Sequence, residues 1–87
     1  MVKVAELADM TVFIPTSERG GRGLIEPPHV HVCEGKRPHE NASKFWLDPV
    51  KLEHNKNRLS ASQLRKAEEY ICLERRKLIA EWHRIHG

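Results

Sequence analysis

The last third of the chain carries the pattern of an amphipathic helix, and no other feature limits the fold as strongly. Ser60 and Gln63 have the spacing of a capping box, in which each side chain bonds the other residue's backbone. Leu59 and Leu64 have the spacing of a hydrophobic staple. The pattern predicts one long helix over about residues 61–86, and its apolar stripe must be buried against another layer. The stripe contains Leu64, Ala67, Ile71, Leu78, Trp82 and Ile85, widened on one flank by Cys72 and Ile79.

Two charged residues, Glu68 and Arg75, fall inside this stripe at about 100° per residue. A buried charge is costly unless it is paired. Either both side chains lie at the margin of the stripe, which we favour, or Arg75 pairs with a carboxylate of the sheet. A helix of about 25 residues is about 38 Å long, whereas a strand of six residues spans about 20 Å. The last turns therefore project beyond a sheet, or pack on the N-terminal segment or on another subunit.

The front of the chain has the composition of β-strands. Residues 10–15 are rich in β-branched and aromatic side chains, and residues 29–33 alternate between apolar and polar after two prolines. Residues 43–47 return as the second strand of a hairpin. Residues 51–58 leave room for a fourth short strand, and residues 4–9 form either a short helix or an extension of the first strand.

These elements predict an α+β fold, a three- to four-stranded antiparallel sheet packed against one long C-terminal helix. With 87 residues and 10.1 kDa, the chain has room for a single domain over residues 1–87, with its strands within residues 10–58. Alternation puts Val30 and Val32 on one face of their strand. We expect the helix to cover these valines, which leaves His29 and His31 turned outward.

Composition excludes several classes of protein. No stretch approaches the roughly 18 apolar residues of a membrane span, and the start of the chain is too acidic for a signal peptide. We therefore expect a cytoplasmic protein that does not bind membranes. Two cysteines, Cys33 and Cys72, cannot form a disulfide framework, and we expect free thiols. Residues 49–87 carry nine Lys/Arg against five Asp/Glu, a net charge of +4 that can attract an anionic partner.

The clearest candidate for chemistry is the run His29-x-His31-x-Cys33. Residues two apart on a strand share a face at about 7 Å, so two imidazoles could converge on zinc with His39 or His54 as a third ligand. The interpretation that we favour is structural, with both histidines hydrogen-bonded to carboxylates such as Glu26. We accordingly expect neither a bound metal nor a cofactor.

Basic loop residues form the second candidate. Arg19 and Arg22 lie in a glycine-rich loop, and Lys36 and Arg37 lie at the predicted hairpin tip. Solvated loop cations are the default interpretation, and a contact surface for a partner is the functional one. A nuclease would need a general base, a general acid and cations near the phosphate, roles open to a catalytic pair His29 and His31 with these cations.

The runs Glu26–Val32 and Lys44–Leu47, followed by a helix ending near Trp82, resemble a small bacterial family catalogued as a domain of unknown function. The similarity covers roughly residues 10–87, with a PPH-x-HV core as its most specific element. It implies no established activity and no catalytic residue. It does imply a gene that lies beside another small reading frame in a toxin–antitoxin-like pair. The loops at residues 17–23 and 35–41 look longer here than in that family.

Together these observations predict a small binding module of a toxin–antitoxin-like pair. Its contact surface, formed by the exposed histidine face and the basic loops, would hold a cognate small protein or RNA or DNA. One alternative is a small metal-independent ribonuclease toxin that uses His29 and His31. Another is a structural homodimer through the projecting end of the helix. Whether the protein is an enzyme is left open by the sequence.

Overall fold

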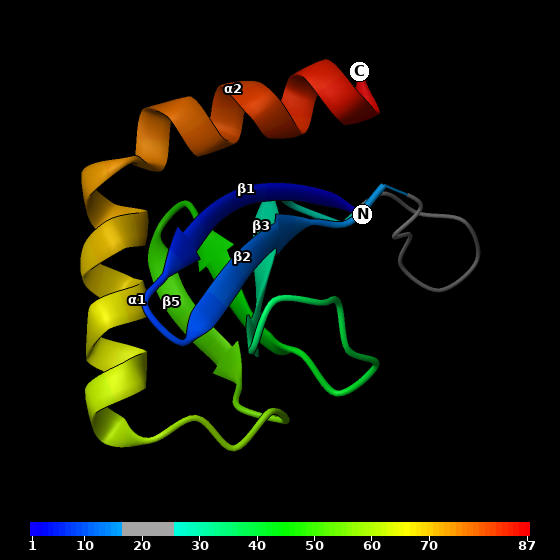
Figure 1. Cartoon of the computed structure of the whole chain (residues 1–87). Coiled ribbons are helices and arrows are strands. Elements are labelled where there is room, and N and C mark those ends of the chain that lie inside the picture. The colour runs from blue at the N-terminus through cyan, green and yellow to red at the C-terminus, as the bar shows by residue number, and fades with distance from the viewer. Residues whose placement is uncertain (17–25) are drawn as a thin grey trace.

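The computed structural model in Figure 1 describes residues 1–16 and 26–87. Five strands are followed by two helices. The strands are β1 (Val2–Leu7), β2 (Met10–Ile14), β3 (His29–Glu34), β4 (Ser43–Leu47) and β5 (Val50–His54). The helices are α1 (Ala61–Leu73) and α2 (Arg75–His86).

The strands form one antiparallel sheet in the order β1-β2-β3-β4-β5, so each strand lies beside its neighbour in sequence. The predicted α+β class and antiparallel sheet are confirmed. The expected number of three or four strands is wrong, because the chain begins with a further strand, β1. The segment that the sequence left ambiguous pairs with β2 through the turn at Ala8 and Asp9, with Leu7 opposite Met10.

The predicted long helix is two helices that meet at Glu74. Glu74 has φ −103° and ψ 17°, and it serves as the C-cap of α1 and the N-cap of α2. Figure 1 shows α1 beside β5 and α2 crossing above the sheet. The bend shows how a helical segment longer than the strands is accommodated. The last turn of α2 packs on the segment after β2, where His86 Nε2 donates to the Pro15 carbonyl oxygen at 2.6 Å.

The start of α1 follows the prediction closely. Ser60 Oγ accepts a hydrogen bond from Gln63 N at 3.1 Å, and Gln63 Oε1 accepts one from Ser60 N at 2.8 Å. The capping box is therefore confirmed, and it satisfies backbone donors that the first helical turn leaves without intrahelical partners. Neither helix in the described part of the chain has the length and apolar composition needed to cross a bilayer.

The core lies between the helices and one face of the sheet. Val30 and Val32 are fully buried and share a cluster with Ile71 and Leu78, as the alternation of β3 predicts. Leu64 is half-buried against the same cluster. Cys72, which was expected to widen the apolar stripe, is exposed instead. The buried members of this core are Met10, Val12, Ile14, Val30, Val32, Phe45, Leu47, Leu59, Ala67, Ile71, Leu78 and Trp82.

A smaller cluster lies on the opposite face of the sheet and consists of Phe13, Cys33 and Ala42. Cys33 and Cys72 are both free thiols, as expected. Burial raises the pKa of the Cys33 thiol, which keeps it protonated and unreactive. Both faces of the central strands are thus partly covered, which bears directly on the histidines of β3.

Candidate functional site

His29 lies on the face of β3 that was predicted, but it is not accessible. Its side chain is 0% exposed, and its ring centroid lies 4.6 Å from that of Trp82 and 5.6 Å from that of Trp46. Its Nδ1 donates to the carbonyl oxygen of Pro27 at 2.9 Å. The expectation of an outward, available imidazole is therefore wrong for His29. The bent helix brings Trp82 over the start of β3, which a straight helix would not do.

His31 is half-buried and lies beside His29, with ring centroids 5.4 Å apart. It faces Phe13 on one neighbouring strand and Lys44 on the other. The two imidazoles thus share a face at close range, as the two-residue spacing predicts. In residues 1–16 and 26–87, no group of three or more His, Cys, Asp or Glu side chains is arranged to hold a metal ion.

An ion pair between Lys44 and Glu26 occupies the same face. Lys44 is only 8% exposed, its Nζ lies 2.8 Å from Glu26 Oε1, and the ammonium sits 4.4 Å from the centroid of Trp46. The hydrogen bond from Lys44 holds the pKa of the Glu26 carboxyl below its ordinary value of 4.5, although burial opposes the effect. Glu26, the carboxylate predicted on this face, is present there and pairs with Lys44.

His54 and Glu53 complete this face of the β4–β5 hairpin. Burial lowers the pKa of His54 below its ordinary 6.5, and the charges of Lys56 and Lys44 lower it further. Trp46 Nε1 donates to the carboxylate of Glu53. Ion pairs and hydrogen bonds thus engage Lys44, Glu26, Trp46 and Glu53 on this face, whereas the buried Nδ1 of His54 has no hydrogen-bond partner among the described residues. The outer face is therefore a poor candidate for a substrate site.

The predicted basic residues separate into two groups. Arg19 and Arg22 lie outside the described residues. Lys36 and Arg37 are exposed in the loop between β3 and β4, as expected. That loop follows the end of β3, whereas His29 begins it, so five residues of strand put about 17 Å between the ends. The structure does not bring these cations together with the catalytic pair that a nuclease would need.

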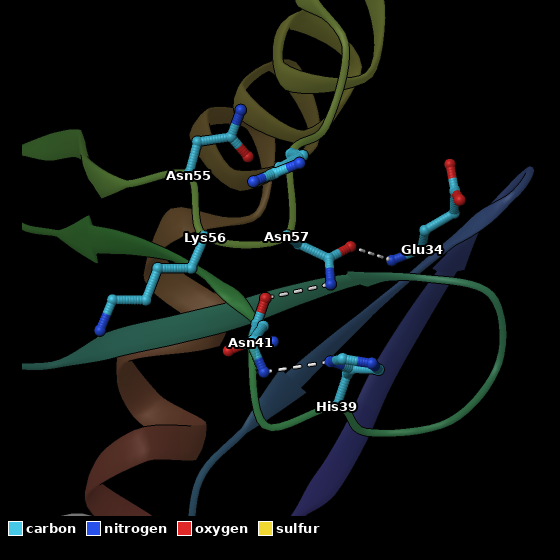
Figure 2. A pocket seen from close by; sticks show the side chains of 7 residues that line it. Glu34, His39, Asn41, Asn55, Lys56 and Asn57 are labelled. Carbon is cyan, nitrogen blue, oxygen red and sulfur yellow. Dashed lines mark hydrogen bonds between the residues drawn. The ribbon is translucent and has the colours of Figure 1, made fainter.

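A polar cleft of about 680 Å³ lies at this end of the sheet (Figure 2). The loop after β3 forms one wall, and the turn between β5 and α1 forms the other. Two segments that are distant in sequence therefore meet here. The residues that line the cleft are Glu34, His39, Asn41, Asn55, Lys56, Asn57 and Arg58.

Asn57 holds the two walls together. Its Oδ1 accepts a hydrogen bond from Glu34 N at 2.8 Å, and its Nδ2 donates to the carbonyl oxygen of Asn41 at 3.0 Å. Its own backbone N donates to Ser43 Oγ at 3.2 Å. Figure 2 shows the amide of Asn57 bridging from the turn to the opposite loop. One side chain thus fixes the width of the cleft.

Asn55 fixes the turn against the helix. Its Oδ1 accepts from Ser43 Oγ at 2.6 Å and from Leu59 N at 2.9 Å, while its Nδ2 donates to the carbonyl oxygen of Leu59 at 2.9 Å. The backbone must then reverse sharply, and Arg58 adopts a left-handed conformation with φ 56°. The side chains of both asparagines form hydrogen bonds within the protein. The charged side chains of Lys56 and Arg58 are therefore the groups of this turn that can contact a ligand.

Both walls of the cleft contribute polar side chains. The cations Lys56 and Arg58 project from the turn, and the imidazole of His39 lies on the opposite loop, with its Nδ1 accepting a hydrogen bond from Asn41 N at 3.1 Å. Within residues 1–16 and 26–87, Glu34 is the one carboxylate that lines the cleft, and it accepts a hydrogen bond from Gln63 Nε2 at 2.9 Å.

Lys36 and Arg37 belong to the same loop as His39, so two of the predicted binding residues adjoin the cleft in sequence. Lys56 and Arg58 are not among the binding residues that the sequence predicts. The only local signal was the run Asn-Lys-Asn, which is typical of any polar turn. The exposed cations Lys56 and Arg58 lie next to asparagines that the scaffold holds in place. Such an arrangement suits an anionic ligand from solution, because cations hold phosphate or carboxylate oxygens by charge-assisted hydrogen bonds.

Comparison with protein families gives one match. A family described as a domain of unknown function, DUF4160, matches residues 22–83. That segment contains β3 to β5, α1, most of α2 and all seven residues of the cleft. Comparisons with curated proteins and with solved structures give no significant match.

Proposed function

The chain belongs to the family described as a domain of unknown function (DUF4160), and from this premise we propose that it is a small module that binds the phosphate backbone of a nucleic acid in the polar cleft. The observation that carries the proposal is the meeting of two loops that place Lys56, Arg58 and His39 around one cleft. Arginine and lysine contacts to phosphates supply most of the affinity of nucleic-acid binding that does not depend on sequence.

The chemistry of the lining favours a nucleic acid over a cognate protein. Protein interfaces are usually anchored by buried aromatic or aliphatic side chains at their centre. Among the described residues, the cleft is lined by charged, amide and imidazole groups, with no aliphatic side chain, Phe, Tyr or Trp. The same absence of stacking groups from the lining predicts contacts to the backbone and little discrimination between base sequences.

We also propose that the module works in a bacterial toxin–antitoxin-like pair, as the resemblance of residues 26–32 and 44–47 implies. In that setting the cognate small protein would bind elsewhere on the surface or compete for the cleft. Co-expression with the product of the adjacent gene should give a complex that survives gel filtration. Recovery of the two proteins in separate peaks would contradict this part of the proposal.

The ribonuclease alternative receives no support from a specific observation. A general acid or base must reach the proton that it transfers. His29 is enclosed by Trp82 and Trp46, and Lys36 and Arg37 lie beyond the far end of its strand. The geometry around His29 therefore does not favour a ribonuclease function.

The direct test measures binding of fluorescein-labelled 20-nucleotide RNA by fluorescence anisotropy at about 50 mM and about 200 mM KCl. The wild-type affinity should fall steeply as salt rises, because each neutralised phosphate contributes about −0.9 to the slope of log K against log salt for a duplex and about −0.7 for a single strand. The Lys56→Gln/Arg58→Gly variant should bind about tenfold or more weakly, with a slope shallower by about one unit for each lost contact.

The matched control is Lys66→Gln/Arg76→Gln, which removes the same charge from exposed positions on the helices. Glycine at position 58 suits the left-handed backbone, so weaker binding cannot be blamed on a misfolded turn. Equal losses in the two double variants would mean that net charge, and not the cleft, attracts RNA. No wild-type binding at 50 mM KCl would overturn the proposal outright.

A further inference from the structure

The outer edge of β1 is a surface feature that the proposed binding of nucleic acid in the cleft does not use. β1 lies at one end of the sheet and pairs only with β2, whereas the strand at the other end, β5, has α1 packed beside it. Among the described residues, no backbone hydrogen bond joins the outer edge of β1 to any other segment. An open strand edge presents unpaired N–H and C=O groups to which another strand can add.

A groove runs along this edge, between β1 and the two helices. Its volume is about 230 Å³, and its lining mixes apolar and charged groups. Figure 1 shows β1 at the front of the view, with α2 passing above it. The lining residues are Lys3, Val4, Tyr70, Lys77, Leu78 and Glu81.

The charges along the edge complement themselves under a twofold rotation. A bulge inserts Val4, so that Lys3 lies opposite Phe13 and Glu6 lies opposite Thr11, which puts both charges on one face of β1. Within one chain Lys3 Nζ lies 3.0 Å from Glu6 Oε1, and both side chains are about half exposed. An antiparallel neighbour centred between Val4 and Ala5 would bring Lys3 opposite the second copy's Glu6, and Glu6 opposite its Lys3.

The helix side of the groove also carries opposite charges. Lys77 and Glu81 lie four residues apart on α2, and Glu81 is paired with Arg84 within the chain at 2.7 Å. The charges on β1 therefore carry the argument for a symmetric pair.

We propose that β1 is a dimer interface, in which a second copy of this chain adds its own β1 antiparallel to the first and joins the two sheets into one. Isologous pairing explains why Lys3 and Glu6 occur together on a strand edge with which no described residue pairs its backbone. The competing explanation is that the bulge and the charges guard the edge against pairing, as they do in many monomeric proteins. The two explanations predict different solution states.

The test is sedimentation velocity of the protein with an untagged N-terminus, from about 5 μM to about 500 μM, on three chains. Wild type should be dimeric. Lys3→Glu should dimerise about tenfold or more weakly, because it places carboxylates opposite each other at both ends of the paired strands. Lys3→Glu/Glu6→Lys restores opposite charges across the axis and should restore the dimer. Circular dichroism of each variant checks that the exposed substitutions leave the fold intact.

Amide hydrogen exchange locates the interface independently of the variants. The amides of Val2–Leu7 should become more protected as wild-type concentration rises, and this dependence should vanish in Lys3→Glu. A monomer throughout the concentration range overturns the proposal, as does a dimer that Lys3→Glu leaves unchanged. RNA binding is measured separately below the dimerisation range, so failure of this interface leaves the proposed function standing.

Discussion

Ala8 holds a backbone conformation that ordinarily favours glycine. It has φ 54° in the two-residue turn between β1 and β2. The left-handed region costs a residue with a Cβ about 1–2 kcal/mol, while glycine costs about 0.5–1 kcal/mol in extra entropy of the unfolded chain. Ala8→Gly should therefore stabilise the protein, by about 0.5–1 kcal/mol in urea unfolding. Ala80→Gly, an exposed helical position, should instead destabilise by about 1 kcal/mol. A loss of stability in both variants would contradict the turn geometry.

Glu26 is the partner that makes the buried ammonium of Lys44 tolerable. Glu26→Gln leaves the charge of Lys44 without its counterion, and the free energy of unfolding should fall by about 1–2 kcal/mol at neutral pH. The control Glu68→Gln removes an exposed carboxylate and should change stability by less than about 0.5 kcal/mol.

The pH dependence of this pair has a defined sign. The pKa of Glu26 is lowered in the folded protein relative to 4.5, so its contribution to stability is fully present above pH 4.5 and is lost as the pH falls through the lowered folded value. The difference between wild type and Glu26→Gln should shrink in that acid range. A difference that stays constant from pH 7 to pH 3 would show that the carboxylate charge is not what stabilises Lys44.

At the scale of elements, Arg75 anchors the bend between the helices. Its Nε donates to the carbonyl oxygen of Leu47 at 3.0 Å, and its Nη2 lies 2.5 Å from Asp48 Oδ1. The sequence left two alternatives open for Arg75, and the structure contains elements of both. Its side chain is 41% exposed, as the favoured position at the margin of the stripe predicts, and it also pairs with Asp48 in the turn between β4 and β5. Glu68 is exposed.

Arg75→Lys tests this anchor. A lysine ammonium cannot reproduce the fork of donors that reaches a carbonyl and a carboxylate together. The free energy of unfolding should fall by about 1 kcal/mol, while Arg76→Lys, one residue further and exposed, should have no measurable effect. If the two variants unfolded at the same urea concentration, the contact of Arg75 with the β4–β5 turn would not hold α2 in place.

Local sequence patterns did not predict strand β1 or the break between α1 and α2. β1 was ambiguous because six residues are too few for helical and strand periods to be distinguished, and its turn contains Ala8 where a hairpin usually has glycine or asparagine. The break at Glu74 carries no glycine or proline in the sequence. A straight helix would have satisfied the same apolar stripe, and the contact of Arg75 with a distant turn favours the bent one.

At the scale of the whole molecule, the bend determines what is buried. Because α2 crosses the sheet, Trp82 covers His29. The ring of His86 stacks on Trp82 at a centroid distance of 4.0 Å, and its Nε2 reaches the carbonyl oxygen of Pro15. His29 thereby becomes buried and His31 half-buried, and the accessible polar side chains gather in the cleft at the other end of β3. Lys56 and Arg58 gain significance there only because Asn57 ties their turn to the loop carrying His39.

The sequence by itself determined the features that depend on neighbours within a turn or a strand. These are the capping box at Ser60, the strands of the β3–β4 hairpin, and the opposite faces of Val30 and His29. The tertiary structure alone decided the burial of His29, the bend at Glu74 and the gathering of Lys56 and Arg58 with His39. The reason is physical, because periods and caps are set by hydrogen bonds a few residues apart. Exposure and proximity are set by which distant element packs over a side chain, and that depends on the free energy of the assembled core.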